Sequence, residues 1–270
     1  MVYISGFSSI SPFGIGIEKL IGRMQKDSTA SSKNRLPNQL VYSHIKGLNR
    51  LPKVSRYGCI AVSEALRFAG YKWSSEKDSR VGVVVSNNYG SLEAIQDMFE
   101  ECDKYGPTKV NPSIFPGTVL NVVGGHISIV FKFNGPNITL SEGIDSGFKS
   151  LLYAYDLIQQ GKAENVLVCD LNIFPPPKYK SEVEDFLPDF ECVGALLLEK
   201  TPKNKKHSLH LSINPANKEG GPLEMSRNVI REMIIKSFTL LKDDRNSNDT
   251  IYTHAIGHGE YCINISRVSE

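Results

Sequence analysis

Short apolar segments rich in β-branched residues alternate along the chain with longer segments whose apolar positions follow the helical period. This alternation predicts an α/β protein with a largely buried sheet. The predicted strands cover residues 2–6, 80–86, 137–140, 166–170, 194–199, 209–214 and 249–253. The predicted helices cover residues 17–24, 54–68, 91–104, 119–131, 148–160 and 225–241.

The predicted helix at 148–160 has the clearest amphipathic pattern. Gly161 follows it, where a glycine commonly ends a helix. One apolar stripe runs along this helix through Phe148, Leu151, Leu152, Tyr155 and Ile158. This stripe predicts a helix that packs one face on the sheet.

Three polar or proline-rich segments predict loops, at residues 26–50, 174–188 and 200–206. The last has four lysines in seven positions, which is typical of a solvated loop. We expect it to join a first part, residues 1–200, to a shorter second part, residues 201–270.

The charge balance is nearly even, with 31 Lys and Arg against 29 Asp and Glu among 270 residues. Such a balance indicates no nucleic-acid or anionic-membrane partner. The apolar runs are far shorter than a membrane-spanning helix needs, and residues 1–6 lack the pattern of a signal peptide. We therefore expect a cytoplasmic protein, whose five scattered cysteines are free thiols.

Simple catalytic and cofactor motifs are absent from the sequence. It has no phosphate-binding loop, no dinucleotide fingerprint and no G-x-S-x-G motif. His254 and His258 have the i, i+4 spacing of a metal pair, but Gly257 disfavours a helix there. We expect neither a metal nor a cofactor.

The segment at 137–147 predicts a strand, a tight turn and the start of the helix at 148–160. Such a turn aims the first N–H groups of the helix, and its positive dipole end, at one point. A cysteine placed there would be an activated nucleophile. At this segment the chain resembles the β-ketoacyl synthases, the condensing enzymes of fatty-acid and polyketide assembly.

The resemblance extends over the first two-thirds of the chain. Tyr3 to Gly14 is similar to the family's opening strand and loop, and Asn111 to Pro116 is similar to the stretch that precedes the nucleophile. Further matching segments are 55–70, 80–91, 125–126, 135–137, 160–163 and 194–199. The resemblance implies a thiolase-like layered α/β fold, largely the N-terminal half with a truncated C-terminal half.

The chain departs from the family at the nucleophile, because Ile144 stands where active members have cysteine. Isoleucine has neither a lone pair nor an ionisable proton, so it forms no thioester. It also lacks the amide of the glutamine found there in decarboxylating or chain-length-factor relatives. His258 loosely resembles the first family histidine, and the second histidine motif has no counterpart.

The resemblance implies a catalytically inactive subunit similar to a chain-length factor. It would form a heterodimer with an active ketosynthase in type II polyketide, polyene or fatty-acid-type biosynthesis, while the acyl carrier protein docks mainly on that partner. The implied pseudo-active site comprises Ser141, Glu142, Gly143, Ile144, Asp145, Ser146, Gly147 and His258. The implied dimer strand and tunnel wall comprise Asn137, Ile138, Thr139, Leu140, Ile114, Phe115, Pro116, Gly117 and Thr118.

The residues leave other interpretations open. Ser146 with the carboxylates of Glu142 and Asp145 would suit an acyl-transfer or hydrolytic enzyme, for which His126 or His258 is the available base. Capping of the helix by Ser141 or Asp145 is the simpler account of these groups, and His126 fits a packed core. Core packing explains Ile114 and Phe115 as well as a tunnel does. A homodimeric acyl-binding regulatory module is a third interpretation.

Overall fold

The computed structural model describes residues 1–24, 34–73, 76–182, 187, 189–216, 228–243, 248–255 and 259–268. The strands are β1 (Val2–Ser11), β2 (Gly14–Ile15), β3 (Val81–Asn87), β4 (Asn137–Leu140), β5 (Asn165–Asn172), β6 (Cys192–Glu199), β7 (Leu209–Pro215), β8 (Asn248–Ala255) and β9 (Gly259–Arg267). The α-helices are α1 (Ile17–Met24), α2 (Lys53–Phe68), α3 (Leu92–Tyr105), α4 (Val122–Phe131), α5 (Ser146–Gln159) and α6 (Val229–Lys242). Short 3-10 helices include η1 (Leu48–Arg50), η2 (Pro107–Lys109), η3 (Pro112–Thr118), η4 (Gly143–Asp145), η5 (Pro177–Glu182) and η7 (Lys205–His207).

The strands of the described chain form one mixed sheet in the order β4-β3-β5-β6-β1-β7-β9-β8, with β2 paired to β1. β3 runs parallel to both β4 and β5, and the other pairings are antiparallel. In this register Ser86 of β3 lies between Leu140 of β4 and Asp170 of β5. The carboxyl ends of three neighbouring strands therefore meet, and the segments that follow them converge.

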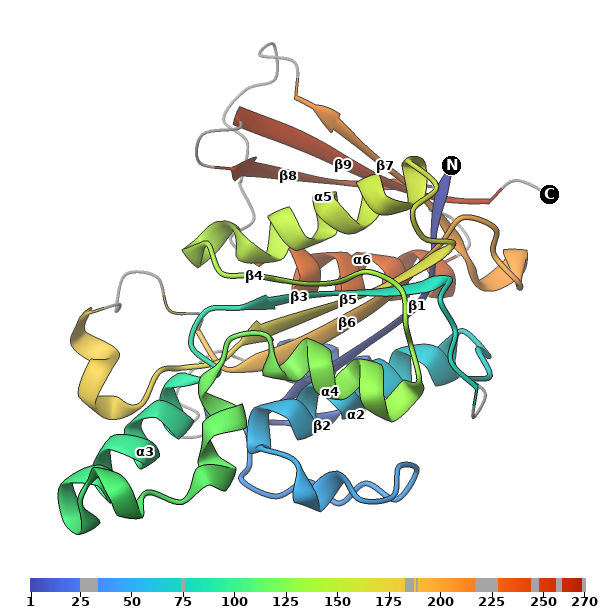
Figure 1. The fold of residues 1–270 in the computed structure, drawn as a ribbon. Coiled ribbons are helices and arrows are strands. Elements are labelled where there is room, and N and C mark those ends of the chain that lie inside the picture. Colours follow the sequence, from blue (N-terminus) through green and yellow to red (C-terminus); the bar gives the residue numbers. More distant parts are fainter. Residues whose placement is uncertain are drawn as a thin grey trace.

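The elements stack in layers (Figure 1). α2 and α4 cover one face of the β4-β3-β5-β6-β1 part of the sheet, and α5 and α6 cover the other face. β7, β9 and β8 then lie over α5 and α6 from the opposite side. The helices α5 and α6 are therefore enclosed between two parts of one sheet.

The layering explains why β6 is apolar along its whole length. Every residue of β6 is buried. Leu196 and Leu198 belong to the core on the side of α5 and α6, and Ala195 and Leu197 belong to the core on the side of α2 and α4. A strand covered on both faces needs apolar side chains at consecutive positions, whereas a half-exposed strand alternates.

The strands β7, β9 and β8 show the alternating pattern instead. Ile263 and Ile265 of β9 are buried against α5 and α6. Asn264 lies between them in sequence, is paired with Ser212 and Thr250 on the flanking strands, and accepts a hydrogen bond from the Thr250 hydroxyl at 2.9 Å. The face of these strands that points away from the helices is therefore polar.

The helix α4 is the most apolar helix of the chain. It buries Val123, Ile127 and Phe131 in the core that it shares with α2 and β3. No single helix in the described ranges has the length and apolar character to cross a bilayer. Only the bent pair η3 and α4, at 99° to each other, meets both conditions when the two are added together.

Most predicted elements are confirmed within a few residues, including the predicted strand at 137–140, which has the bounds of β4. β9 was not predicted and follows the last predicted strand, at residues 249–253. β1 continues to Ser11 and is longer than expected, because both of its faces are covered. Part of the helix expected at 225–241 lies outside the described residues, and its described part begins at Val229.

Candidate functional site

The converging ends of β3, β4 and β5 build the candidate site. β4 leads through Ser141 and Glu142 into η4, and α5 begins directly afterwards at Ser146. Gly143 has a φ of +60°, a left-handed conformation that glycine adopts without a Cβ clash. The predicted strand, tight turn and helix are therefore present, and Ile144 lies within the turn.

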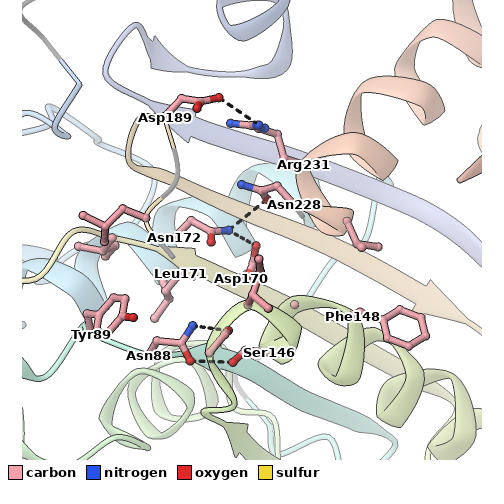
Figure 2. A pocket seen from close by; sticks show the side chains of 16 residues that line it. Asn88, Tyr89, Ser146, Phe148, Asp170, Leu171, Asn172, Asp189, Asn228 and Arg231 are labelled. Atoms are coloured by element: carbon pink, nitrogen blue, oxygen red, sulfur yellow. Dashed lines mark hydrogen bonds and ion pairs between the residues drawn. The ribbon is translucent and has the colours of Figure 1, made fainter. Parts of the chain in front are cut away.

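The hydroxyl group of Ser146 holds this turn together. It accepts a hydrogen bond from the backbone N–H of Glu142 at 2.7 Å and donates one to Oδ1 of Asn88 at 2.7 Å. Nδ2 of Asn88 donates in turn to the carbonyl oxygen of Gly143 at 2.8 Å. Ser146 thus ties the turn to the loop after β3, as Figure 2 shows.

The predicted helix capping is wrong in its details. Asp145 occupies the N-cap position of α5 and is buried, but its side chain makes no capping hydrogen bond. Ser141 is exposed, and the carboxylate of Glu142 pairs with Lys149. The network around Ser146 fixes the turn instead, which leaves the side chain of Asp145 without that role.

His126 is not part of this site. Its Nδ1 lies 2.8 Å from Oγ of the fully buried Ser55, which joins α4 to α2 on the other face of the sheet from α5. Burial lowers the pKa of His126. The structure does not bring His126 to Ser146, and His258 lies outside the described residues.

A cavity of about 160 Å³ lies beside the turn, at the start of α5 and of α6. Among the described residues that line it, none is a cysteine or a histidine. Figure 2 labels its polar and aromatic lining together with Leu171: Asn88, Tyr89, Ser146, Phe148, Asp170, Leu171, Asn172, Asp189, Asn228 and Arg231. Polar groups from the segment after β3, from β5, from α5 and from α6 thus meet in one cavity.

Asp170 is the buried acid of this cavity, with only 5% of its surface exposed. It accepts hydrogen bonds from the Ser86 hydroxyl and from Nδ2 of Asn172. Gly147 lies beside it, and a Cβ added there would be in ordinary van der Waals contact, 3.4 Å from Oδ1 of Asp170. Burial raises the pKa of Asp170 to about 6, although both hydrogen bonds and the charge of Arg231 oppose the shift.

Arg231 of α6 is the basic group of the cavity. Its Nη2 lies 4.0 Å from Oδ2 of the exposed Asp189, and the guanidinium lies 4.9 Å from the ring centre of Phe190. Nη1 of Arg231 is buried and has no hydrogen-bond partner among the described residues. The described lining of the cavity therefore contains a buried acid, Asp170, an exposed acid, Asp189, and one base, Arg231.

The sequence did not single out Asn88, Asp170, Asn172, Asn228 or Arg231. Asp170 ends a predicted strand, and Asn172 follows two residues later. Polar residues at the carboxyl end of a strand often line a site, so this pair was the sequence signal for the cavity. Arg231 belongs to a helix far along the chain. Only the packing of α6 beside α5 brings it to the cavity.

The expected dimer strand is β4, which lies at the opposite edge of the sheet from β8. β4 is the edge strand and pairs only with β3 in the described structure. Phe115 of η3 is 63% exposed, so core packing does not account for it. The large apolar residues exposed on η3, α4, α5 and the connecting segment are Phe115, Val119, Leu120, Ile129 and Tyr153.

Replacing Asp170 with asparagine should stabilise the protein in a pH-dependent way. The folded-state pKa of about 6 lies above the ordinary 3.8, so the native state disfavours ionisation, and this cost grows as the pH rises from about 4 to above 6. We expect Asp170→Asn to raise the free energy of unfolding at pH 8 by about 3 kcal/mol and to change it little at pH 4.

Urea denaturation at both pH values measures this difference. Asp103→Asn, at an exposed position of α3, is the matched control and should leave the difference between the two pH values unchanged. Equal effects of Asp170→Asn at pH 4 and pH 8 would contradict the assigned burial cost.

Comparison with known proteins identifies the family. The model of the β-ketoacyl synthase N-terminal domain matches residues 2–179. The 3-oxoacyl-[acyl-carrier-protein] synthase 2 of Vibrio cholerae is 30% identical over 123 residues, which cover 46% of this chain and 30% of the relative. The enzyme of the same name from Rhizobium meliloti is 26% identical over 187 residues, covering 60% of this chain and 44% of the relative. The chain thus matches less than half the length of these relatives.

Solved structures show the same fold. A type II polyketide synthase acyl-carrier protein in complex with its ketosynthase gives a TM-score of 0.77 at 18% identity, with 99% of each chain covered. A ketosynthase in complex with its chain length factor from Xenorhabdus doucetiae gives 0.63 at 20% identity, with 98% of each covered. These likenesses confirm the thiolase-like layered fold. Since the family model spans well over half of the sequence, the chain belongs to the β-ketoacyl synthase family.

Proposed function

We propose that this chain is a non-catalytic, chain-length-factor-like subunit that pairs with an active ketosynthase and shapes its acyl tunnel. The observation that carries the proposal is Ile144, which occupies the turn where active members of the family have their nucleophilic cysteine. An aliphatic side chain there attacks no thioester. The acyl chain would stay on the partner subunit throughout condensation.

The surroundings of Ile144 support the absence of a substitute nucleophile. The hydroxyl of Ser146 both accepts and donates a hydrogen bond within the turn, and no histidine lines the described cavity to deprotonate it. Asp170, the buried acid that lines the cavity, is already hydrogen-bonded to Ser86 and Asn172. These contacts favour a structural role over acyl transfer or hydrolysis by Ser146.

The edge strand β4 supports pairing with a second protein. An unpaired edge offers backbone N–H and C=O groups to another strand. Helices α4 and α5 contact β4 from its two faces. Ile129 of α4 is 66% exposed and Tyr153 of α5 is 46% exposed. Apolar side chains thus flank the edge, as expected of an interface.

In the family that this chain resembles, dimers form through the strand that precedes the nucleophile. By this resemblance, the corresponding strand here is β4. Structures similar in fold include a ketosynthase in complex with its chain length factor. An acyl-carrier protein in complex with its ketosynthase is also among them. We propose that β4 pairs with the corresponding strand of an active ketosynthase in the cytoplasm, and that the carrier protein docks mainly on that partner.

Co-expression with a full-length ketosynthase, followed by size-exclusion chromatography, tests the proposal. We expect a heterodimer, and condensation that is lost when this chain is omitted. Elution of this chain as a homodimer or a monomer beside the ketosynthase would count against pairing and favour the regulatory module.

Replacing Ile129 with glutamate should break the heterodimer. A carboxylate beside the edge of β4 would have to be desolvated at the interface, so we expect the dissociation constant to rise at least tenfold. Titration calorimetry against the ketosynthase measures this. Val41→Glu, at a 97% exposed position outside this surface, is the control and should bind as the native chain does.

Replacing Ile144 with alanine should leave pathway output largely intact, because the proposal assigns no chemistry to this side chain. The measurement is the rate of condensation by the heterodimer. Alanine at the nucleophilic cysteine of the active partner is the control and should abolish condensation. A loss of more than about tenfold in a folded Ile144→Ala heterodimer would contradict the proposal.

Replacing Phe115 with alanine should change the length or yield of the product. Phe115 is exposed on η3, which contacts α4, and by resemblance to the family it would wall the partner's acyl tunnel. Mass spectrometry of the released products measures the change. Phe99→Ala, at an exposed aromatic position on α3, is the control. An unchanged product profile would remove Phe115 from the tunnel wall.

A further inference from the structure

Among the described residues that line the cavity beside α5, one buried side-chain polar atom has no hydrogen-bond partner. The hydroxyl of Ser146, the amide of Asn88 and the carboxylate of Asp170 all have hydrogen-bond partners within the site. Asn172 donates to Asp170 and, at 3.2 Å, to Oδ1 of Asn228. Nη1 of Arg231 is the exception, because it is buried and has no partner among the described residues.

A buried guanidinium N–H without an acceptor is costly, and a ligand that supplies the acceptor removes that cost. The planar guanidinium matches a carboxylate in shape and charge. Asp189 engages only Nη2, at 4.0 Å, and is exposed to solvent. Nη1 therefore favours an anionic ligand over a neutral one.

We propose that this cavity binds a small aliphatic carboxylate, held between the guanidinium of Arg231 and the carboxyl group of Asp170. The proposal concerns this chain alone and does not rest on pairing with a ketosynthase. Binding by the isolated chain and formation of the heterodimer are measured separately, so either one can fail without the other.

Asp170 takes part by accepting a proton. Two carboxylates side by side repel, but one proton shared between them becomes a strong hydrogen bond. Burial raises the pKa of Asp170 to about 6, so protonation at neutral pH costs little. The groups that face Asp170 are Ser86 of β3, Gly147 of α5, Asn172 of β5, Gly194 of β6 and Arg231 of α6. Of these groups only Arg231 carries charge. Burial raises the pKa of the thiols of Cys169 and Cys192, and the charge of Asp170 raises both further.

The rest of the cavity fits a short hydrocarbon tail. Ile144, Leu171, Ile173 and Leu187 line it together with the polar groups. About 160 Å³ is room for several water molecules, or for a carboxylate with a tail of a few carbons. Butyrate has this size, and butyramide is its neutral counterpart of nearly equal shape.

Titration calorimetry of the full chain with butyrate and butyramide tests the inference. We expect saturable binding of butyrate and at least tenfold weaker binding of butyramide. Butyrate affinity should fall about tenfold from pH 6.5 to pH 7.5, because above about pH 6 each bound ligand must bring a proton to Asp170. Titrations at pH 7 in buffers of different ionisation enthalpy should show uptake of about one proton.

Two variants test whether Arg231 and Asp170 bind butyrate. Arg231→Met should weaken butyrate binding at least tenfold, whereas Arg67→Met, at an exposed arginine of α2, should not change it. Asp170→Asn keeps a hydrogen-bond donor without titration, so it should bind butyrate at pH 7.5 as tightly as the native chain does at pH 5.5. Circular dichroism confirms folding, and if Arg231→Met fails to fold, Asp170→Asn decides.

Any of three results would overturn the inference. These are no saturable binding of butyrate by the folded chain, equal binding of butyrate and butyramide, and an affinity in the native chain that does not change with pH. Proton uptake that persists in Asp170→Asn would likewise remove Asp170 from the site.

Discussion

The parallel pairing of β3 with β4 and β5 is the constraint on which the candidate site depends. It aligns Ser86 with Leu140 and Asp170, so that the turn after β4 and the segment after β3 meet at one point. A slip of β5 by one residue would exchange the two faces of the strand. Cys169, now buried on the side of α2 and α4, would then point to the cavity in place of Asp170. The register therefore decides which chemical group the site contains.

Strands buried on two sides are continuous apolar runs, and β3, β5 and β6 were predicted from such runs. The amphipathic α5 and the turn before it were equally predictable, because each is a local pattern. β9 was not predicted, although its apolar positions alternate as those of its predicted partners β7 and β8 do.

The site itself was predicted only in its local part. The turn around Ile144 was found, but the hydrogen bonds of Ser146 involve Asn88, which lies 58 positions away. Arg231 comes to the same cavity as Asp170 through the packing of α6 beside α5, and no periodicity encodes that proximity. For Phe115 the sequence left core packing and an exposed role equally open, and its high exposure decides between them. Long-range contacts and exposure are properties of the fold that single segments do not carry.

Ile144 and Asp170 are physically linked, because both line the same cavity. A thiolate at position 144 would face a buried carboxylate of the same charge. Two charges of the same sign that line one cavity repel each other. That repulsion raises the pKa of a thiol and suppresses its reactive form. An acid at position 170 is thus compatible with an aliphatic residue in the turn and would hinder a catalytic cysteine there. The same acid, with Arg231 across the cavity, gives the site a polar character that a bound acyl thioester does not require.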